Sequence, residues 1–108
     1  MEKFSLEAMA REQLDRARSL PSQRSATTVY GGHEHRLRQT VVALAAGTSM
    51  AEHDNTGEAT VFVLRGRVRL HGPQAVWEGR RGDLLVVPEA RHSLEAVEHS
   101  AILLTVAK

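Results

Sequence analysis

The sequence predicts a single domain with an all-β body that is preceded by one helix. Its 108 residues fall within the size range of one folded domain. Apolar residues recur at helical spacing only before Pro21. After Pro21, short runs rich in Val, Leu and Thr are separated by turns that contain glycine, which is typical of an all-β body. We therefore expect a helix and linker at residues 1–24 and a β-domain at residues 25–108.

The segment 6–20 is predicted to form an amphipathic helix. Ser5 is a residue type that caps helix N-termini, and Pro21 stops the helix. Apolar side chains recur at steps of three and four residues and therefore share one face: Leu6, Met9, Ala10, Leu14 and Ala17. This face is suited to cover a sheet.

Strands are predicted wherever runs of β-forming residues lie between turns. The expected strands are residues 27–30, 37–45, 59–64, 67–71, 75–77, 84–87, 92–97 and 101–106. Residues 67–71 alternate strictly between polar and apolar, so one face of that strand meets solvent. Residues 61–64, 84–87 and 102–104 are apolar at every position, which indicates strands that are covered on both faces.

The strands that are apolar on both faces need a second layer that covers the face turned away from the core of the β-domain. The candidates are the N-terminal helix and a second copy of the chain. We expect a homodimer with Phe62 and its neighbours in the interface. The alternative is that the helix alone covers these strands.

Composition and charge exclude several classes of partner. With 14 basic and 13 acidic residues mixed along the chain, no concentrated positive stripe is present, and a nucleic-acid partner is not expected. The apolar runs are far shorter than the roughly 20 residues of a membrane helix, and charges interrupt the N-terminal segment, so we expect no membrane partner and a cytoplasmic location. Because the chain has no cysteine, thiolate chemistry is excluded, and its six histidines are the first candidates for a site.

A glycine-anchored spacing surrounds one of these histidines. Gly47 is followed after five residues by His53, then after one residue by Asn55. Ala59 follows after three more residues, and Gly66 after a further six. This segment resembles the first motif of the cupin superfamily, G-x5-H-x-H-x3,4-E-x6-G.

A second segment resembles the second cupin motif. Gly82 and Pro88 match its opening G-x5-P, and His92 lies close to the position of its histidine. The resemblance implies a cupin-type double-stranded β-helix, which is a jelly-roll barrel, here with one N-terminal α-helix. Because this fold hosts many chemistries and also non-enzymatic binders, it does not by itself identify an activity.

Residues two apart in a strand point to the same side, so His53 and Asn55 are expected to face one cavity. His92 opens a strand on the opposite side of the same barrel mouth. The candidate ligand-binding residues are His53, Asn55, Val61, Val63, His92 and Leu94.

The resemblance also implies where a metal would bind. Metal-binding cupins use both histidines and the glutamate of the first motif and the histidine of the second. Here Asn55 and Ala59 stand at two of these positions, so only His53 and His92 remain. A bulge beside Gly57 would turn Glu58 inward and complete a set of His53, His92 and Glu58; without a bulge, Glu58 faces outward. We expect at most a weakly bound divalent transition metal.

Three functions remain open. The first is a module that binds a small organic ligand in the barrel pocket, with a degenerate metal site. The second is a metal-dependent enzyme of dioxygenase or isomerase type that uses His53, His92 and Glu58. The third is metal-free acid and base catalysis, with His53 and His92 as catalytic residues. Trp77, the only tryptophan, is interpreted as part of a packed hairpin.

Overall fold

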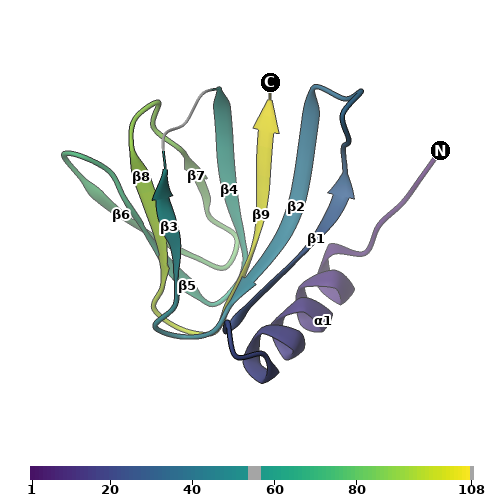
Figure 1. Ribbon diagram of the computed structural model, residues 1–108, viewed down its shortest axis with the longest axis horizontal. Helices are drawn as coiled ribbons and strands as arrows, with labels where there is room; N and C mark the ends of the chain where they lie inside the picture. Colours follow the sequence, from purple (N-terminus) through teal and green to yellow (C-terminus); the bar gives the residue numbers. More distant parts are fainter. Residues whose placement is uncertain (54–56, 108) are drawn as a thin grey trace.

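The protein consists of two facing antiparallel sheets with one helix on the outside (Figure 1). The computed structural model describes residues 1–53 and 57–107, and only the backbone of residues 51–53. In chain order, the elements are α1 (Leu6–Ser19), β1 (Arg24–Tyr30), β2 (Leu37–Leu44), β3 (Ser49–His53), β4 (Glu58–Arg65), β5 (Arg67–His71), β6 (Val76–Arg80), β7 (Leu84–Val86), β8 (His92–Ala96) and β9 (Ser100–Ala107). No helix among the described residues is long and apolar enough to cross a membrane.

The chain passes repeatedly from one sheet to the other. The five-stranded sheet has the order β1-β2-β9-β4-β7, and the four-stranded sheet has the order β3-β8-β5-β6. This arrangement confirms the predicted all-β class with one N-terminal helix. One strand, β3, was not among the expected strands, because Ser49–His53 contains no apolar run. It nevertheless pairs with β8 along one edge of the smaller sheet.

The helix lies against the outer face of the larger sheet, beside β1 and β2 (Figure 1). The Ser5 side chain caps it by accepting a hydrogen bond from the Ala8 amide at 3.2 Å, as the sequence predicted. Ala10 and Ala17 are fully buried against Ala43 of β2 and Ala101 of β9. Because these four side chains are methyl groups, the helix backbone can approach the sheet closely.

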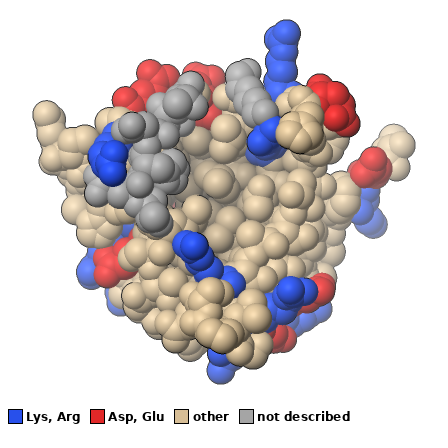
Figure 2. All heavy atoms as spheres, in the orientation of Figure 1, with Lys and Arg blue, Asp and Glu red and all other residues tan. Residues whose placement is uncertain are grey.

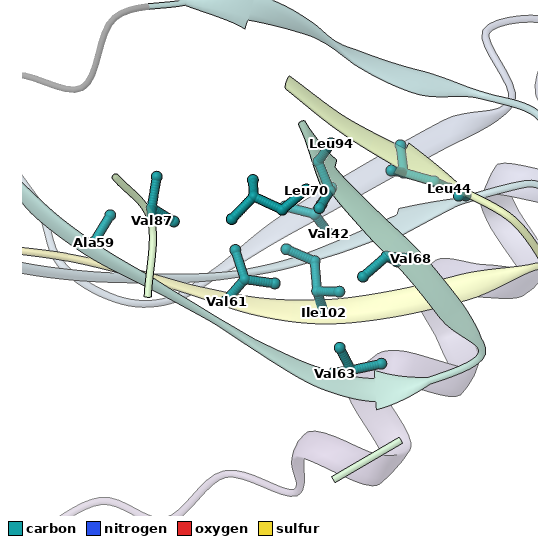
Figure 3. Close-up of a cluster of buried hydrophobic side chains, with 11 residues drawn as sticks. Val42, Leu44, Ala59, Val61, Val63, Val68, Leu70, Val87, Leu94 and Ile102 are labelled. Atoms are coloured by element: carbon teal, nitrogen blue, oxygen red, sulfur yellow. The ribbon is translucent and has the colours of Figure 1, made fainter. Parts of the chain in front are cut away.

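The core lies between the two sheets (Figure 3). The side chains of β4 alternate: Ala59, Val61 and Val63 are buried, and the residues between them are only partly buried. The core cluster also contains Val42, Leu44, Val68, Leu70, Val87, Leu94, Ala96 and Ile102. Its members come from β2, β4, β5, β8, β9 and the residue after β7, so the inner faces of both sheets contribute to one core.

The helix covers only part of the outer face of the larger sheet. At the far edge from α1, Leu84 and Val86 of β7 are 58% and 61% exposed. Phe62, their neighbour in β4, is partly exposed. A groove of about 550 Å³ crosses the same region between Glu58, Val86 and Thr105. The alternative that the helix covers these strands is therefore wrong for β7, and the homodimer with Phe62 in its interface stays a prediction.

Candidate functional site

The inward side chains of both sheets become slightly more exposed toward one end of the barrel. Along β4, the exposed fraction of the inward side chains rises from 0% at Val63 through 3% at Val61 to 8% at Ala59. Along β8, it rises from 0% at Ala96 through 4% at Leu94 to 7% at His92. Because β4 and β8 both begin at this end, we call it the open end of the barrel.

His92 lies at the open end on the inner face of the smaller sheet. The burial of β8 alternates, with His92, Leu94 and Ala96 inside and the residues between them less buried. Leu94 and Ala96 belong to the core cluster, so His92 continues the same row beyond the apolar core. An imidazole that is 7% exposed lies where the apolar lining ends.

The backbone of the preceding loop fixes the tautomer of His92. The Nδ1 atom of the ring lies 2.8 Å from the carbonyl oxygen of Ala90. A carbonyl can only accept a hydrogen bond, so Nδ1 carries the hydrogen and donates it. In the neutral ring, Nε2 then bears the lone pair. An imidazole oriented in this way is able to accept a hydrogen bond, take up a proton or coordinate a metal.

The fold brings His53 to the same place in the barrel as His92. The two residues are directly opposed Cα partners in the antiparallel pair of β3 and β8. Directly opposed residues share one face of a sheet and have Cα atoms about 4.5–5.5 Å apart. Two positions far apart in the sequence are therefore neighbours at the open end. Only the backbone of His53 is described, and Asn55 lies outside the described residues.

The structure does not bring Glu58 to the inner row. Pairing of β4 with β9 is regular from Glu58 through Val63, and its shift comes only between Val63 and Arg65. Without a bulge at the start of β4, Glu58 takes the parity opposite to Ala59 and is exposed on the outer face. Ala59 takes the inward position, and its methyl group offers no donor to a metal.

A tight metal site does not fit the described part of the chain. Within residues 1–50 and 57–107, whose side chains are described, no group of three His, Asp or Glu side chains could hold a metal ion. Transition metals in proteins usually need at least three good donors. The residue at the position of the family's glutamate, Ala59, has none.

The opposite wall of the open end carries an arginine that the sequence analysis did not single out. Arg38 of β2 is the Cα partner of Val106, and Val106 is the partner of Ala59. Val106 packs against the core cluster, so Arg38 lies on the inner face. In the sequence, only the alternation of Arg38 with Thr40 and Val42 indicated that these three residues share one face of the strand. Because apolar residues occupy both faces of this strand, the sequence alone left the inward side undefined.

A smaller cavity is lined in part by the loop that precedes His92. It measures about 300 Å³ and lies between the hairpin of β5 and β6 and the loop from β7 to β8. Its lining residues are Leu70, Gly72, Pro73, Gln74, Ala75, Trp77, Pro88 and Ala90. Trp77 lies in the hairpin of β5 and β6, as interpreted from the sequence. It is 50% exposed, however, so it is not fully packed there. Ala90 connects the cavity to His92, because its carbonyl accepts the hydrogen bond from the ring.

The surface of the molecule is hollowed on the face shown in Figure 2. Uncharged residues line most of the hollow, and basic and acidic side chains lie mainly at its border (Figure 2). This distribution suits an organic molecule with a limited number of polar groups.

Comparison with solved structures places the fold among known proteins. A conserved protein of unknown function from Streptococcus pyogenes superposes with a TM-score of 0.73 at 29% identity, over 82% of this chain and 77% of that one. An RmlC-like cupin protein from Desulfovibrio desulfuricans gives a TM-score of 0.67 at 26% identity, over 78% and 81% of the two chains. A salicylate 1,2-dioxygenase from Pseudaminobacter salicylatoxidans gives 0.75 at 19% identity, over 93% of this chain but only 33% of that one.

No protein-family model matches the sequence, and no curated protein sequence matches it. Further solved structures that match this chain are described as a cupin superfamily protein, a cupin-2 domain protein and a cupin 2 conserved barrel domain protein. The chain therefore has the fold of a small cupin domain with one N-terminal helix.

Proposed function

We propose that this cupin domain binds a small organic molecule at the open end of its barrel, with His53 and His92 as polar contacts. The observation that carries the proposal is the position of His92, a buried imidazole at the edge of an otherwise apolar inner row. Ligand sites in proteins are typically apolar concavities with a few converging polar groups. The register of β3 and β8 supports a role for His53 beside it.

The outward position of Glu58, the third donor of the metal set, supports ligand binding over metal-dependent catalysis. A metal enzyme that uses His53, His92 and Glu58 needs the Glu58 carboxylate inside the barrel, but Glu58 is exposed on the outer face. Salicylate 1,2-dioxygenase shows that this fold is compatible with an enzyme, but at 19% identity the likeness concerns the fold alone. Acid and base catalysis by His53 and His92 requires the same ligand to bind first.

Native mass spectrometry of untagged protein, combined with elemental analysis, tests this proposal. We expect an organic adduct on the folded chain and a transition-metal content far below one atom per chain. His92→Ala removes the inward imidazole, so the adduct is expected to disappear. Ser93→Ala is the matched control, because Ser93 lies next in β8 with the opposite parity and is expected to leave the adduct unchanged.

Three outcomes decide between the functions. Full occupancy by iron, manganese, nickel or zinc that His92→Ala abolishes contradicts the proposal and supports the metal enzyme. An adduct that survives His92→Ala places the ligand elsewhere. Conversion of the released compound by the metal-free wild-type protein, with loss of turnover in His92→Ala, supports acid and base catalysis at this site.

A further inference from the structure

The inner wall opposite His92 carries an arginine, Arg38, that is partly buried. The Nε atom of Arg38 is buried and has no hydrogen-bond partner among the described residues. A buried polar group without a partner is costly, by roughly 1–3 kcal/mol and more if charged. Each such group in a native structure needs an explanation, and a bound water molecule or ion that completes it is one of the known explanations.

None of the ion pairs between described side chains includes Arg38. The ion pairs in the smaller sheet join Arg67 and Arg69 to Glu78, Arg67 to Glu98, and His71 to Glu95. Arg67 and Arg69 alternate with the buried Val68 and Leu70, so these pairs lie on the outer face of the barrel.

The neighbours of Arg38 favour a ligand that is partly apolar. Val106 is the Cα partner of Arg38, and Leu104 is the next inward residue of β9. Both pack against the core but are only partly buried. Gly31 lies against the arginine on the other side, where a Cβ atom would come within 3.2 Å of Arg38 Cγ. The absence of a side chain at Gly31 leaves room for the arginine side chain.

We infer that the ligand of the open end carries a carboxylate and that Arg38 binds it, while the apolar part of the ligand covers Leu104 and Val106. This inference rests on the proposed function. The planar guanidinium presents paired N–H donors that match the two oxygens of a carboxylate. With imidazole on the smaller sheet and guanidinium on the larger sheet, the site suits a small organic acid with a second polar group at its other end.

Matched pairs of acids and amides test this inference. The probes are benzoate with benzamide and hexanoate with hexanamide, each pair having the same shape and differing in charge. Binding is measured by isothermal titration calorimetry and by the NMR signals of the His92 ring. We expect each acid to bind at least about tenfold more tightly than its amide, because hydrogen bonds to charged groups are worth more than neutral ones.

Variants assign the preference to Arg38. Arg38→Gln is expected to bind each acid no more tightly than its amide. Arg38→Lys is expected to retain part of the preference, since it keeps the charge but loses the paired donors. Arg36→Gln is the control, because Arg36 is an exposed arginine that precedes β2 and is expected to leave the preference unchanged. Thermal unfolding of each variant checks that the fold is retained.

The possible failures are distinguishable. Equal binding of acids and amides, with a shift of the His92 signals, overturns the role of Arg38 and leaves the proposed function standing. A preference for acids that survives Arg38→Gln also overturns it. If none of the four probes shifts the His92 signals, both the inference and the proposed function are contradicted for ligands of this size.

Discussion

Two glycines of the cupin-like motifs are predicted to respond very differently to the same substitution. Gly66 joins β4 to β5 with φ +80°, and Gly82 precedes β7 with φ +92°. Both lie in the left-handed region, where an alanine costs about 1–2 kcal/mol. A Cβ atom on Gly82 has nothing within 4 Å. Alanine also reduces the conformational freedom of the unfolded chain, which stabilises the folded state by about 0.4–1 kcal/mol. The net effect of Gly82→Ala should therefore be a destabilisation of about 1 kcal/mol.

Gly66 adds a steric term to the same conformational cost. A Cβ atom there comes within 2.3 Å of the His99 carbonyl oxygen and of Ser100 Oγ, and 2.9 Å from Ser100 Cα. The Ser100 hydroxyl accepts from the Arg67 amide at 3.0 Å and lies within hydrogen-bond distance of two carbonyls, so it is not free to move. Overpacking costs about 1–3 kcal/mol, and an unsatisfied buried polar group costs about as much. The sum for Gly66→Ala is about 4 kcal/mol or more.

Urea unfolding followed by circular dichroism measures both variants. In a thermal scan, the Gly82→Ala midpoint should fall by about 4–8 °C for a domain of this size. The midpoint of the Gly66→Ala variant should fall several times further, or this variant should fail to fold. If the two variants lie within about 0.5 kcal/mol of each other, the tight packing of the β4–β5 turn is refuted, and only the backbone conformation matters at both sites.

The remaining predictions concern the helix, the core and the outer face. Ser5→Ala removes the N-cap of α1 and should lower the free energy of unfolding by about 1 kcal/mol, with Ser22→Ala as an exposed serine control. Ile102→Val removes one methylene group from a side chain that is 1% exposed and should cost about 0.5–1.5 kcal/mol in the same assay. Leu84→Glu places a charge on the exposed edge beside Phe62 and should convert a dimer into a monomer in multi-angle light scattering; a wild-type monomer contradicts the predicted homodimer.

Local periodicity was sufficient to predict the helix, whereas the fold class and the inward row of β4 needed the spacing of the cupin-like motifs as well. Ser5 and Pro21 bracket α1, which ends at Ser19. The strand 59–64 is apolar on both faces, so periodicity alone did not tell which face is inner. The glycine-anchored spacing resolved this by setting the parity of Ala59, which the structure confirms.

The features that the sequence did not predict depend on contacts between residues that are distant in sequence. β3 has no apolar run and is specified by its pairing with β8. Arg38 is an ordinary strand arginine until its register with Val106 places it on the inner face. Trp77 lines a cavity together with Pro88 and Ala90 of the loop from β7 to β8, which are distant from it in sequence. Such features follow from tertiary packing, and the local sequence pattern does not determine them.

A crystal structure of the untagged protein, with anomalous data collected at the absorption edges of the transition metals, shows whether the open end of the barrel holds an organic ligand or a metal. We predict electron density for an organic molecule at the open end of the barrel, in contact with the His92 imidazole, and no anomalous peak beside it. A fully occupied metal between the two histidines, or a His92 ring directed into bulk solvent, would contradict the account.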